Sequence, residues 1–242
     1  MERPYLSVVV PAYNEESRIA ASLGELVGYL ARQAYSWELL VIDDGSTDAT
    51  AAVARQRAGE LESPVRVETV PHAGKGWAVR HGMLASGGEL RFMCDADLAM
   101  PVEQIGAFVE RMADGYDIVA GSRQKEGARR FDEPFGRHVM GRIFNKAVSL
   151  MAVGGFEDTQ CGFKCFKGEV ADELFGLQRT RGFGFDVEVL YLATRKGLRV
   201  LEMPIDWRHQ SSSKVRPILD SFLMLRDTAR VRLRGMPRDS GS

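Results

Sequence analysis

Two aspartates separated by one residue, Asp95 and Asp97, follow a short apolar segment, Leu90 to Cys94. Such a segment predicts a buried strand of a parallel sheet, with the carboxylates placed at the end of the strand. Two carboxylates in that position offer hard oxygen ligands, which Mg²⁺ and Mn²⁺ favour together with phosphate oxygens. Because a carboxylate is costly to bury without a partner, the pair indicates a cation site. A surface turn with the same spacing is the alternative.

Two further polar clusters follow apolar segments nearer the start of the chain. The first consists of Pro11, Ala12, Tyr13, Asn14 and Glu15. Its ring and carboxylate suit stacking on a nucleobase and hydrogen bonding to it, and a strand-to-helix turn capped by Asn14 is the alternative. The second cluster, Asp43 to Ser46, is explained either by a ligand site or by a tight turn with a helix cap.

The segments between these clusters alternate between strand-like and helical patterns of apolar residues. The predicted strands are Leu6–Val10, Glu38–Ile42, Val65–Val70, Leu90–Cys94 and Asp117–Ala120. The predicted helices are Ile19–Leu30, Ala49–Ala58, Gly76–Leu84 and Val102–Met112. This alternation predicts an α/β fold with a mostly parallel sheet flanked by helices, whose ligands bind at the carboxyl ends of the strands. Neither a P-loop nor a dinucleotide-binding glycine motif is present.

Beyond Gly121 the alternation is looser. The segment Arg123–Glu133 carries many charges and predicts a mobile loop. The later predicted elements are helices at Phe135–Val153, Phe185–Thr194 and Ile218–Leu233 and strands at Thr159–Phe166 and Leu198–Pro204. We expect one domain over residues 1–235, with halves at 1–122 and 123–235, and a disordered tail over 236–242.

The charges of the chain are distributed unevenly. The formal net charge is −1, from 32 Lys and Arg and 33 Asp and Glu. Residues 1–122 hold 10 basic and 18 acidic residues, a net of −8, and residues 123–242 hold 22 and 15, a net of +7. The first half thus supplies carboxylates for a metal and a nucleoside, and the second half supplies cations for phosphates or an anionic bilayer. We expect no nucleic-acid partner, and the asymmetry points to an anionic partner confined to the second half.

The composition excludes several other classes of protein. With 45% hydrophobic and 27% charged residues the chain is neither disordered nor fibrous. Three cysteines are too few for a disulfide scaffold and fit a reducing, cytoplasmic setting. We expect no signal peptide, since Glu2 and Arg3 lead directly into a strand-like segment. No apolar run reaches the roughly 18 residues that a membrane span needs, so any membrane contact is expected to be peripheral.

Eight motifs, taken in order, match a known family. The segments SVVVPAYNEE, VIDDGSTD, GKGWAVRHGM, DADLAMP and GSR resemble those of the family-2 glycosyltransferases with a GT-A fold. The segments DTQCGFKCF, FGFDVEVLY and SSSKV are similar to the dolichyl-phosphate β-glucosyltransferase branch, which is related to dolichyl-phosphate mannose synthase. The resemblance extends from Leu6 to about Leu233 and implies a nucleotide-sugar transferase.

The resemblance also implies roles for individual residues. Those that bind the nucleotide-sugar donor would be Pro11, Ala12, Tyr13, Asn14, Glu15, Asp43, Gly74, Lys75, Asp95, Ala96 and Lys214. Asp95 would lie near the ribose and the metal, Asp97 would ligate the metal, and Lys214 would contact the diphosphate. Arg123 and Arg137 match basic positions that hold the acceptor phosphate.

Two positions bear on the reaction and on the sugar. Asp158 is a candidate catalytic base or sugar-binding carboxylate, with a structural cap or turn as the alternative. Mannose synthases of this type often have Gln two residues after the second aspartate, where this chain has Ala99. The absence of this possible metal ligand favours glucose over mannose.

The activity that the resemblance implies is an inverting hexose transfer dependent on Mg²⁺ or Mn²⁺, with UDP-glucose as the favoured donor and a polyprenyl or dolichyl phosphate as acceptor. Its catalytic residues would be Asp97, Asp158 and Lys214. A phosphate acceptor is largely ionised near neutral pH, given a second pKa of about 6, and so needs no general base.

Membrane attachment is expected from two basic amphipathic segments, Phe135–Val153 and Ile218–Leu233, of a kind that lies in an anionic membrane surface. Two helices packed on the core with solvated outer faces are the alternative. The resulting expectation is a cytoplasmic protein bound peripherally to the membrane. Other functions compatible with the motifs are a GDP-mannose-dependent polyprenyl-phosphate mannose synthase, a transferase to a glycan hydroxyl and a catalytically silent nucleotide-sugar binding module.

Overall fold

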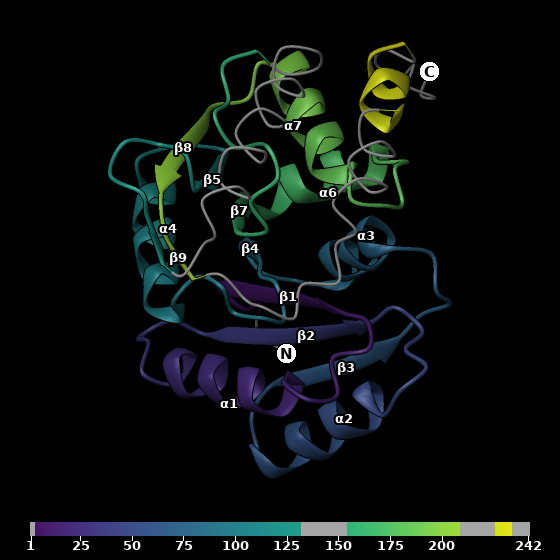
Figure 1. The fold of residues 1–242 in the computed structure, drawn as a ribbon. Helices are drawn as coiled ribbons and strands as arrows, with labels where there is room; N and C mark the ends of the chain where they lie inside the picture. Colours follow the sequence, from purple (N-terminus) through teal and green to yellow (C-terminus); the bar gives the residue numbers. More distant parts are fainter. Residues whose placement is uncertain (1–2, 132–153, 209–225, 234–242) are drawn as a thin grey trace.

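A seven-stranded sheet forms the centre of the computed structural model, which describes residues 3–131, 154–208 and 226–233 (Figure 1). Its strand order is β3-β2-β1-β4-β7-β5-β8. The strands are β1 Leu6–Ala12, β2 Trp37–Asp43, β3 Val65–Thr69, β4 Leu90–Met93, β5 Ile118–Ser122, β7 Lys164–Lys167 and β8 Val200–Pro204. All neighbouring strands are parallel except that β7 runs antiparallel to both β4 and β5. The prediction of a mostly parallel α/β sheet is confirmed.

Helices cover both faces of this sheet because successive strand residues point to opposite sides. Val8 and Val10 join one buried cluster and Val9 joins another. The first face carries α1 Ile19–Leu30, α2 Thr50–Glu60 and α4 Ile105–Ala113, which follows a short 3₁₀ turn, Val102–Gln104. The second face carries α3 Lys75–Ala85, α6 Gly168–Leu177 and α7 Phe185–Arg195. In Figure 1, α1 and α2 lie on the opposite side of β1–β3 from α6 and α7.

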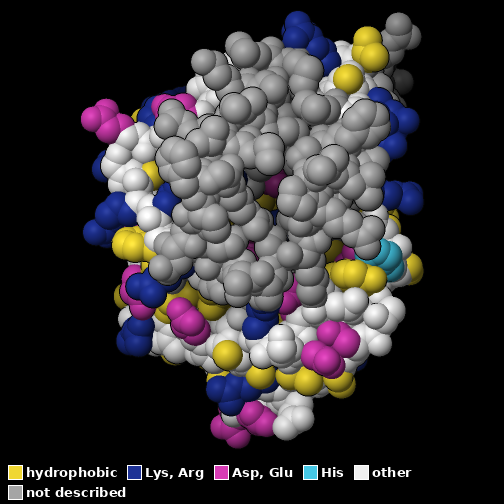
Figure 2. All heavy atoms as spheres, in the orientation of Figure 1, with side chains coloured by type: hydrophobic (Ala, Val, Ile, Leu, Met, Phe, Trp, Pro, Cys, Tyr) yellow, Lys and Arg dark blue, Asp and Glu magenta, His cyan; other side chains and the backbone are white. Residues whose placement is uncertain are grey.

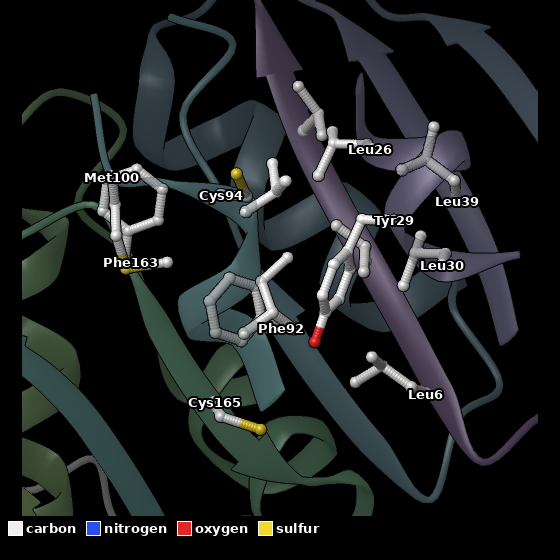
Figure 3. Close-up of a cluster of buried hydrophobic side chains, with 14 of the residues drawn as sticks. Leu6, Leu26, Tyr29, Leu30, Leu39, Phe92, Cys94, Met100, Phe163 and Cys165 are labelled. Carbon is white, nitrogen blue, oxygen red and sulfur yellow. The ribbon is translucent and has the colours of Figure 1, made fainter. Parts of the chain in front are cut away.

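The core beneath α1 is built from both halves of the chain. Figure 3 shows Leu26, Tyr29 and Leu30 of α1 beside β1 and β4. Phe163 and Cys165, from the second half, complete the same cluster. The two halves therefore share one core and one sheet, and neither contains the sheet by itself.

Parts of the second half differ from the sequence expectations. The strand predicted from Thr159 begins only at Lys164, because Asp158 is drawn into hydrogen bonds with Arg123 and the chain turns there. Helix α6 was not predicted, although its buried residues recur at helical spacing. The expected mobile loop instead contains β6, Arg129–Phe131, which pairs in parallel with the equally unexpected β9, Asp206–Arg208.

Several predictions fall outside the described residues. These are the helix at Phe135–Val153, the first part of the helix at Ile218–Leu233 and the tail over 236–242. Residues 226–233 are helical, in agreement with the remainder of that last helix. Within the described ranges, no helix combines the length and the apolar character that crossing a membrane requires.

Candidate active site

The predicted ligand clusters meet at the carboxyl edge of the sheet. Ala12 at the end of β1 is in register with Asp43 at the end of β2, and β4 pairs with the other side of β1 and leads into Asp95. The chain passes from β1 to β2 on one side and later returns to β4 on the other side of β1. Ligands of open α/β sheets bind at such a switch point, outside the carboxyl ends of the strands. Several Asp and Glu side chains lie in the middle and lower part of the face shown in Figure 2.

Asp44 joins two loops of the site. Its carboxylate, only 3% exposed, accepts the backbone N–H groups of Ala73 and Gly74 at 2.9 Å each, and its Oδ2 lies 2.8 Å from His72 Nδ1. Gly74 has a φ of 111°, and a Cβ there would stand 2.7 Å from the carbonyl oxygen of Arg181. Glycine is therefore required at this position, where the loop enters α3 and passes the backbone of Arg181.

Tyr13 and His72 form a stacked aromatic pair beside Asp44. Their ring centroids are 4.2 Å apart and their planes are inclined by 20°. The side chain of His72 is 53% exposed, so the pair borders solvent. His72 was not predicted as a site residue, because its spacing matches no ligand pattern and favours a surface or capping role. The one sequence signal for a site role is that His72 closely follows β3, Val65–Thr69, which ends at this edge of the sheet.

Asn14 and Glu15 make contacts that stabilise the loops at the same edge of the sheet. Asn14 has a φ of 54°, its side-chain oxygen accepts the N–H of Thr47 at 2.8 Å, and its own N–H donates to Ser46 Oγ at 2.9 Å. Glu15 Oε2 lies 2.8 Å from Arg18 Nε. The two bonds of Asn14 tie the β1–α1 loop to the β2–α2 loop. Asn14 therefore has a structural role here, but it does not cap α1, whose N-cap is Arg18. Ser46 serves this link and does not cap α2.

A lysine and an aspartate from different loops form the centre of the site. Lys75 Nζ, at the start of α3, lies 2.5 Å from Asp95 Oδ1. Their side chains are 22% and 27% exposed. Burial would lower the pKa of Lys75, but the charges of Asp95, Asp186 and Asp97 outweigh this effect and raise that pKa to about 12. Lys75 therefore remains a cation at any physiological pH.

Asp97 lies in a very different environment. Partial burial, and after it the charge of Asp95, raise the pKa of Asp97 to about 6, although its Oδ1 accepts the N–H of Ala99 at 3.1 Å. Asp97 also borders a cavity of about 580 Å³ that Arg18 and Arg208 line. Two carboxylates that repel one another beside an open cavity suit a divalent cation, whose charge relieves the repulsion.

The protein would supply only part of such a cation's coordination. Among the residues that the structure describes, no group of three or more His, Cys, Asp or Glu side chains is arranged to hold a metal ion. The remaining ligands would have to be waters or phosphate oxygens, which Mg²⁺ commonly retains when few carboxylates bind it.

Asp158 and Arg123 form a second, more enclosed pair. The Asp158 carboxylate is fully buried and accepts Arg123 Nε at 2.7 Å, Nη2 at 2.9 Å and the backbone N–H at 3.0 Å. Burial would raise the pKa of Asp158, yet the Arg123 guanidinium lowers it to about 2, and Asp158 in turn raises the pKa of Arg123. A carboxylate so engaged and so acidic is a poor general base, and Arg123, proposed for the acceptor phosphate, is bound to it through two nitrogens.

Two of the expected site residues, Lys214 and Arg137, lie outside the described residues. The structure brings the remaining expected donor-binding positions to one edge of the sheet. Those it places there are Pro11, Ala12, Tyr13, Asn14, Glu15, Asp43, Gly74, Lys75, Asp95 and Ala96, and Asp97, expected as a metal ligand, lies beside them.

The chain resembles solved structures over almost its whole length. A structure of glucosyl-3-phosphoglycerate synthase from Mycobacterium tuberculosis in complex with Mn²⁺, UDP-glucose and phosphoglyceric acid matches with a TM-score of 0.71 at 22% identity, covering 98% of this chain and 82% of that one. A complex of the same enzyme with Mg²⁺ and UDP matches with a TM-score of 0.70 at 21% identity, with the same shares covered. These likenesses confirm the fold.

Sequence relatives match at higher identity. A dolichyl-phosphate beta-glucosyltransferase of Trichomonas vaginalis is 37% identical over 223 residues, which are 88% of this chain and 66% of the relative. The dolichyl-phosphate beta-glucosyltransferases of Dictyostelium discoideum and Homo sapiens are each 35% identical, over 95% of this chain and 74% and 75% of their own lengths. The chain thus spans about two thirds to three quarters of these relatives.

The model of the family described as glycosyl transferase family 2 matches residues 7–175, which contain β1 except Leu6, the strands β2 through β7 and most of α6. This span holds the stacked pair of Tyr13 and His72, the Lys75–Asp95 pair and Asp97. Together with relatives of more than 30% identity, the match confirms the resemblance inferred from the motifs. The chain belongs to glycosyl transferase family 2.

Proposed function

We propose that the protein transfers glucose from UDP-glucose to a dolichyl or other polyprenyl phosphate, with inversion at the anomeric carbon, at the cytoplasmic face of a membrane. The observation that carries this proposal is the gathering of Asp43, Asp95, Asp97 and Lys75 at one edge of the sheet. Support for the acceptor comes from the relatives named dolichyl-phosphate beta-glucosyltransferase. Support for the donor comes from the fold shared with an enzyme crystallised with UDP-glucose.

The nucleoside of the donor would bind against the first three strands. The stacked rings of Tyr13 and His72 offer an aromatic surface for the base, and the buried carboxylate of Asp43 offers a hydrogen-bond acceptor. Asp95, next to Lys75, would lie near the ribose. The nucleoside would thus contact residues that follow three different strands, β1, β2 and β4.

Asp97, with Asp95, would hold Mg²⁺ or Mn²⁺, which supplies positive charge against the diphosphate that leaves the sugar. Lys75 contributes a fixed cation within the same site, since its pKa is about 12. Lys214 is proposed to contact the diphosphate as well. These cations favour departure of the diphosphate without proton transfer to it.

The acceptor phosphate would approach from the side of Arg123. A phosphate monoester is largely dianionic near neutral pH, so the reaction does not require a base. Asp158 then has a positioning role, since it holds the guanidinium of Arg123 through two hydrogen bonds. Arg137 is proposed as the second cation for this phosphate, and a peripheral contact with an anionic membrane surface would bring the lipid to the site.

The test offers three donors, UDP-glucose, UDP-N-acetylglucosamine and GDP-mannose, each with a short polyprenyl phosphate or the matching polyprenol and with Mn²⁺. Mass spectrometry should detect a glucosyl polyprenyl phosphate from UDP-glucose alone and nothing from the polyprenol. Transfer of mannose would establish the mannose synthase instead. Transfer to the polyprenol would point to a hydroxyl-directed enzyme, and UDP binding without any transfer would establish a binding module.

A further inference from the structure

A buried ion pair lies beneath the candidate site. Lys164, the first residue of β7, is 1% exposed, and its Nζ lies 2.6 Å from Oδ1 of Asp186 in α7, which is 5% exposed. Removing two charges from water is costly, and an apolar pair of similar volume often stabilises a core at least as well. The pair therefore calls for an explanation other than stability.

The ammonium group of Lys164 also holds a loop. Its Nζ donates to the carbonyl oxygen of Cys161 at 2.5 Å, which fixes the turn that precedes β7. On the other side of that turn, the carbonyl oxygen of Phe163 accepts the N–H of Gly121 at 2.9 Å. The Cys161–Phe163 turn is thus fastened from both sides.

That turn lies directly against Asp95. A Cβ added to Gly162 would stand 2.0 Å from Asp95 Oδ2 and 2.8 Å from its Oδ1, distances that no real Cβ tolerates. The same carboxylate is paired with Lys75, whose Nζ is 2.5 Å from Oδ1. The close approach of Gly162 and the ion pair with Lys75 therefore both restrict the orientation of Asp95.

Positive and negative side chains alternate through this region, in the order Lys164, Asp186, Lys75 and Asp95. Asp186 is bonded to Lys164 and acts on Lys75, whose pKa it helps to raise. Burial raises the pKa of Asp186, and Lys164 and then Lys75 oppose that effect. Two aspartates and two lysines thus form one continuous cluster that reaches from α7 to the carboxyl end of β4.

We propose that Lys164 is a positioning residue of the nucleotide site. With Asp186 as its counter-charge, it holds the carbonyl of Cys161 and so keeps Gly162 against Asp95, which sets the Asp95 carboxylate toward a nucleoside diphosphate and its divalent cation. This role rests on the proposed function for the identity of the ligand. It gives a reason for a glycine at 162 and for a lysine in the core.

The main test replaces the pair by apolar residues of similar volume, in the double variant Lys164→Met with Asp186→Leu, so that no charge is left buried alone. Binding of UDP is measured by calorimetry with and without Mn²⁺, and thermal unfolding is recorded alongside. The variant is expected to unfold near the wild-type temperature and to bind UDP with Mn²⁺ about tenfold more weakly, the loss typical when a group that orients a metal ligand is removed. A purely structural role would lower UDP affinity equally with and without Mn²⁺.

A second variant, Gly162→Ala, reaches the same carboxylate without touching the ion pair. It is expected to weaken Mn²⁺-dependent UDP binding to a similar extent, while Gly176→Ala, where a Cβ meets nothing within 4 Å, leaves it unchanged. Wild-type affinity with Mn²⁺ in both the double variant and Gly162→Ala would overturn the positioning role while the proposed donor stands. Absence of Mn²⁺-dependent UDP binding in the wild type would overturn the donor and this role together.

Discussion

Asp97 and Asp158, two acidic residues of one site, have opposite electrostatic surroundings. Burial, and after it the charge of Asp95, raise the pKa of Asp97 to about 6, whereas the Arg123 guanidinium overcomes the effect of burial on Asp158 and lowers its pKa to about 2. The protein pairs Asp158 with Arg123 through two nitrogens, whereas one lysine, Lys75, faces the two carboxylates of Asp95 and Asp97 and contacts Asp95 alone. This difference supports the roles proposed above, metal binding for Asp97 and the positioning of Arg123 for Asp158.

The largest expected effect comes from Asp97→Ala. Transfer with Mn²⁺ should fall by at least about a hundredfold, because the variant loses a ligand of the ion that stabilises the leaving diphosphate. Thermal unfolding should show that Mn²⁺ with UDP stabilises the wild type and not the variant, since only the state that binds gains stability. Asp114→Ala, at an exposed pair with Arg111, is the control. Full transfer by Asp97→Ala would remove the distinction between the two aspartates.

Asp158→Asn tests the contribution of the Asp158–Arg123 pair to the free energy of unfolding. The variant leaves Arg123 facing a neutral amide, so the free energy of unfolding at pH 7 should drop by about 3 kcal/mol, as when one partner of a buried pair is removed. Because the pKa of Asp158 falls on folding, its contribution is complete above the unfolded value of about 4 and is lost as the pH falls through about 2.

Urea unfolding of the wild type and Asp158→Asn across this range measures that dependence. The difference between the two proteins should be constant above about pH 5 and should shrink between about pH 4 and pH 2. A gap that persists undiminished at pH 2 would show that Asp158 contributes through packing and not through its charge.

His72→Ala probes the donor side with a smaller expected effect. Loss of the stacked ring should weaken UDP binding about fivefold, which corresponds to roughly 1 kcal/mol of aromatic stacking. His72→Phe keeps the ring and should retain most of the affinity, and His81→Ala, whose ring bonds to Glu68 outside the stacked pair, is the control. Equal UDP affinity of His72→Ala and wild type, measured by calorimetry, would remove His72 from the nucleoside site.

The smallest effect is expected for Lys125→Ala. Lys125 lies two residues from Arg123 and pairs with Glu157, but both side chains of that pair are more than 40% exposed. Exposed pairs of this kind contribute little because water and salt screen them. Transfer rates and unfolding midpoints should match the wild type, and a marked loss of activity would extend the acceptor region beyond the Arg123–Asp158 pair.

The sequence was a good guide where local patterns determine the structure. Apolar periodicity placed β1, α1 and β2 to within two residues, and the polar residues after β1, β2 and β4 had to meet because parallel strands end at one edge. The stacking of Tyr13 on His72 could not be predicted in this way, since it joins loops that are far apart in the sequence.

Prediction was weaker where distant segments decide the structure. Asp158 was considered as a base because the sequence does not reveal that Arg123, 35 positions earlier, binds it. With Asp158 held by this bond, the chain turns where a strand was predicted from Thr159, and β7 begins at Lys164. Likewise β6 is too short to show a strand period, and it becomes a strand only by pairing with β9.

The antiparallel strand β7 has a consequence for how the chain folds. It fills the place between β4 and β5, two strands that come much earlier in the sequence. During synthesis, the edges of β4 and β5 that pair with β7 therefore lack their hydrogen-bond partners until Lys167 has been synthesised. Contacts between residues so far apart in the sequence also form slowly. The same late insertion places the turn at Gly162 against Asp95, so the proposed nucleotide site forms only after β7 has joined the sheet.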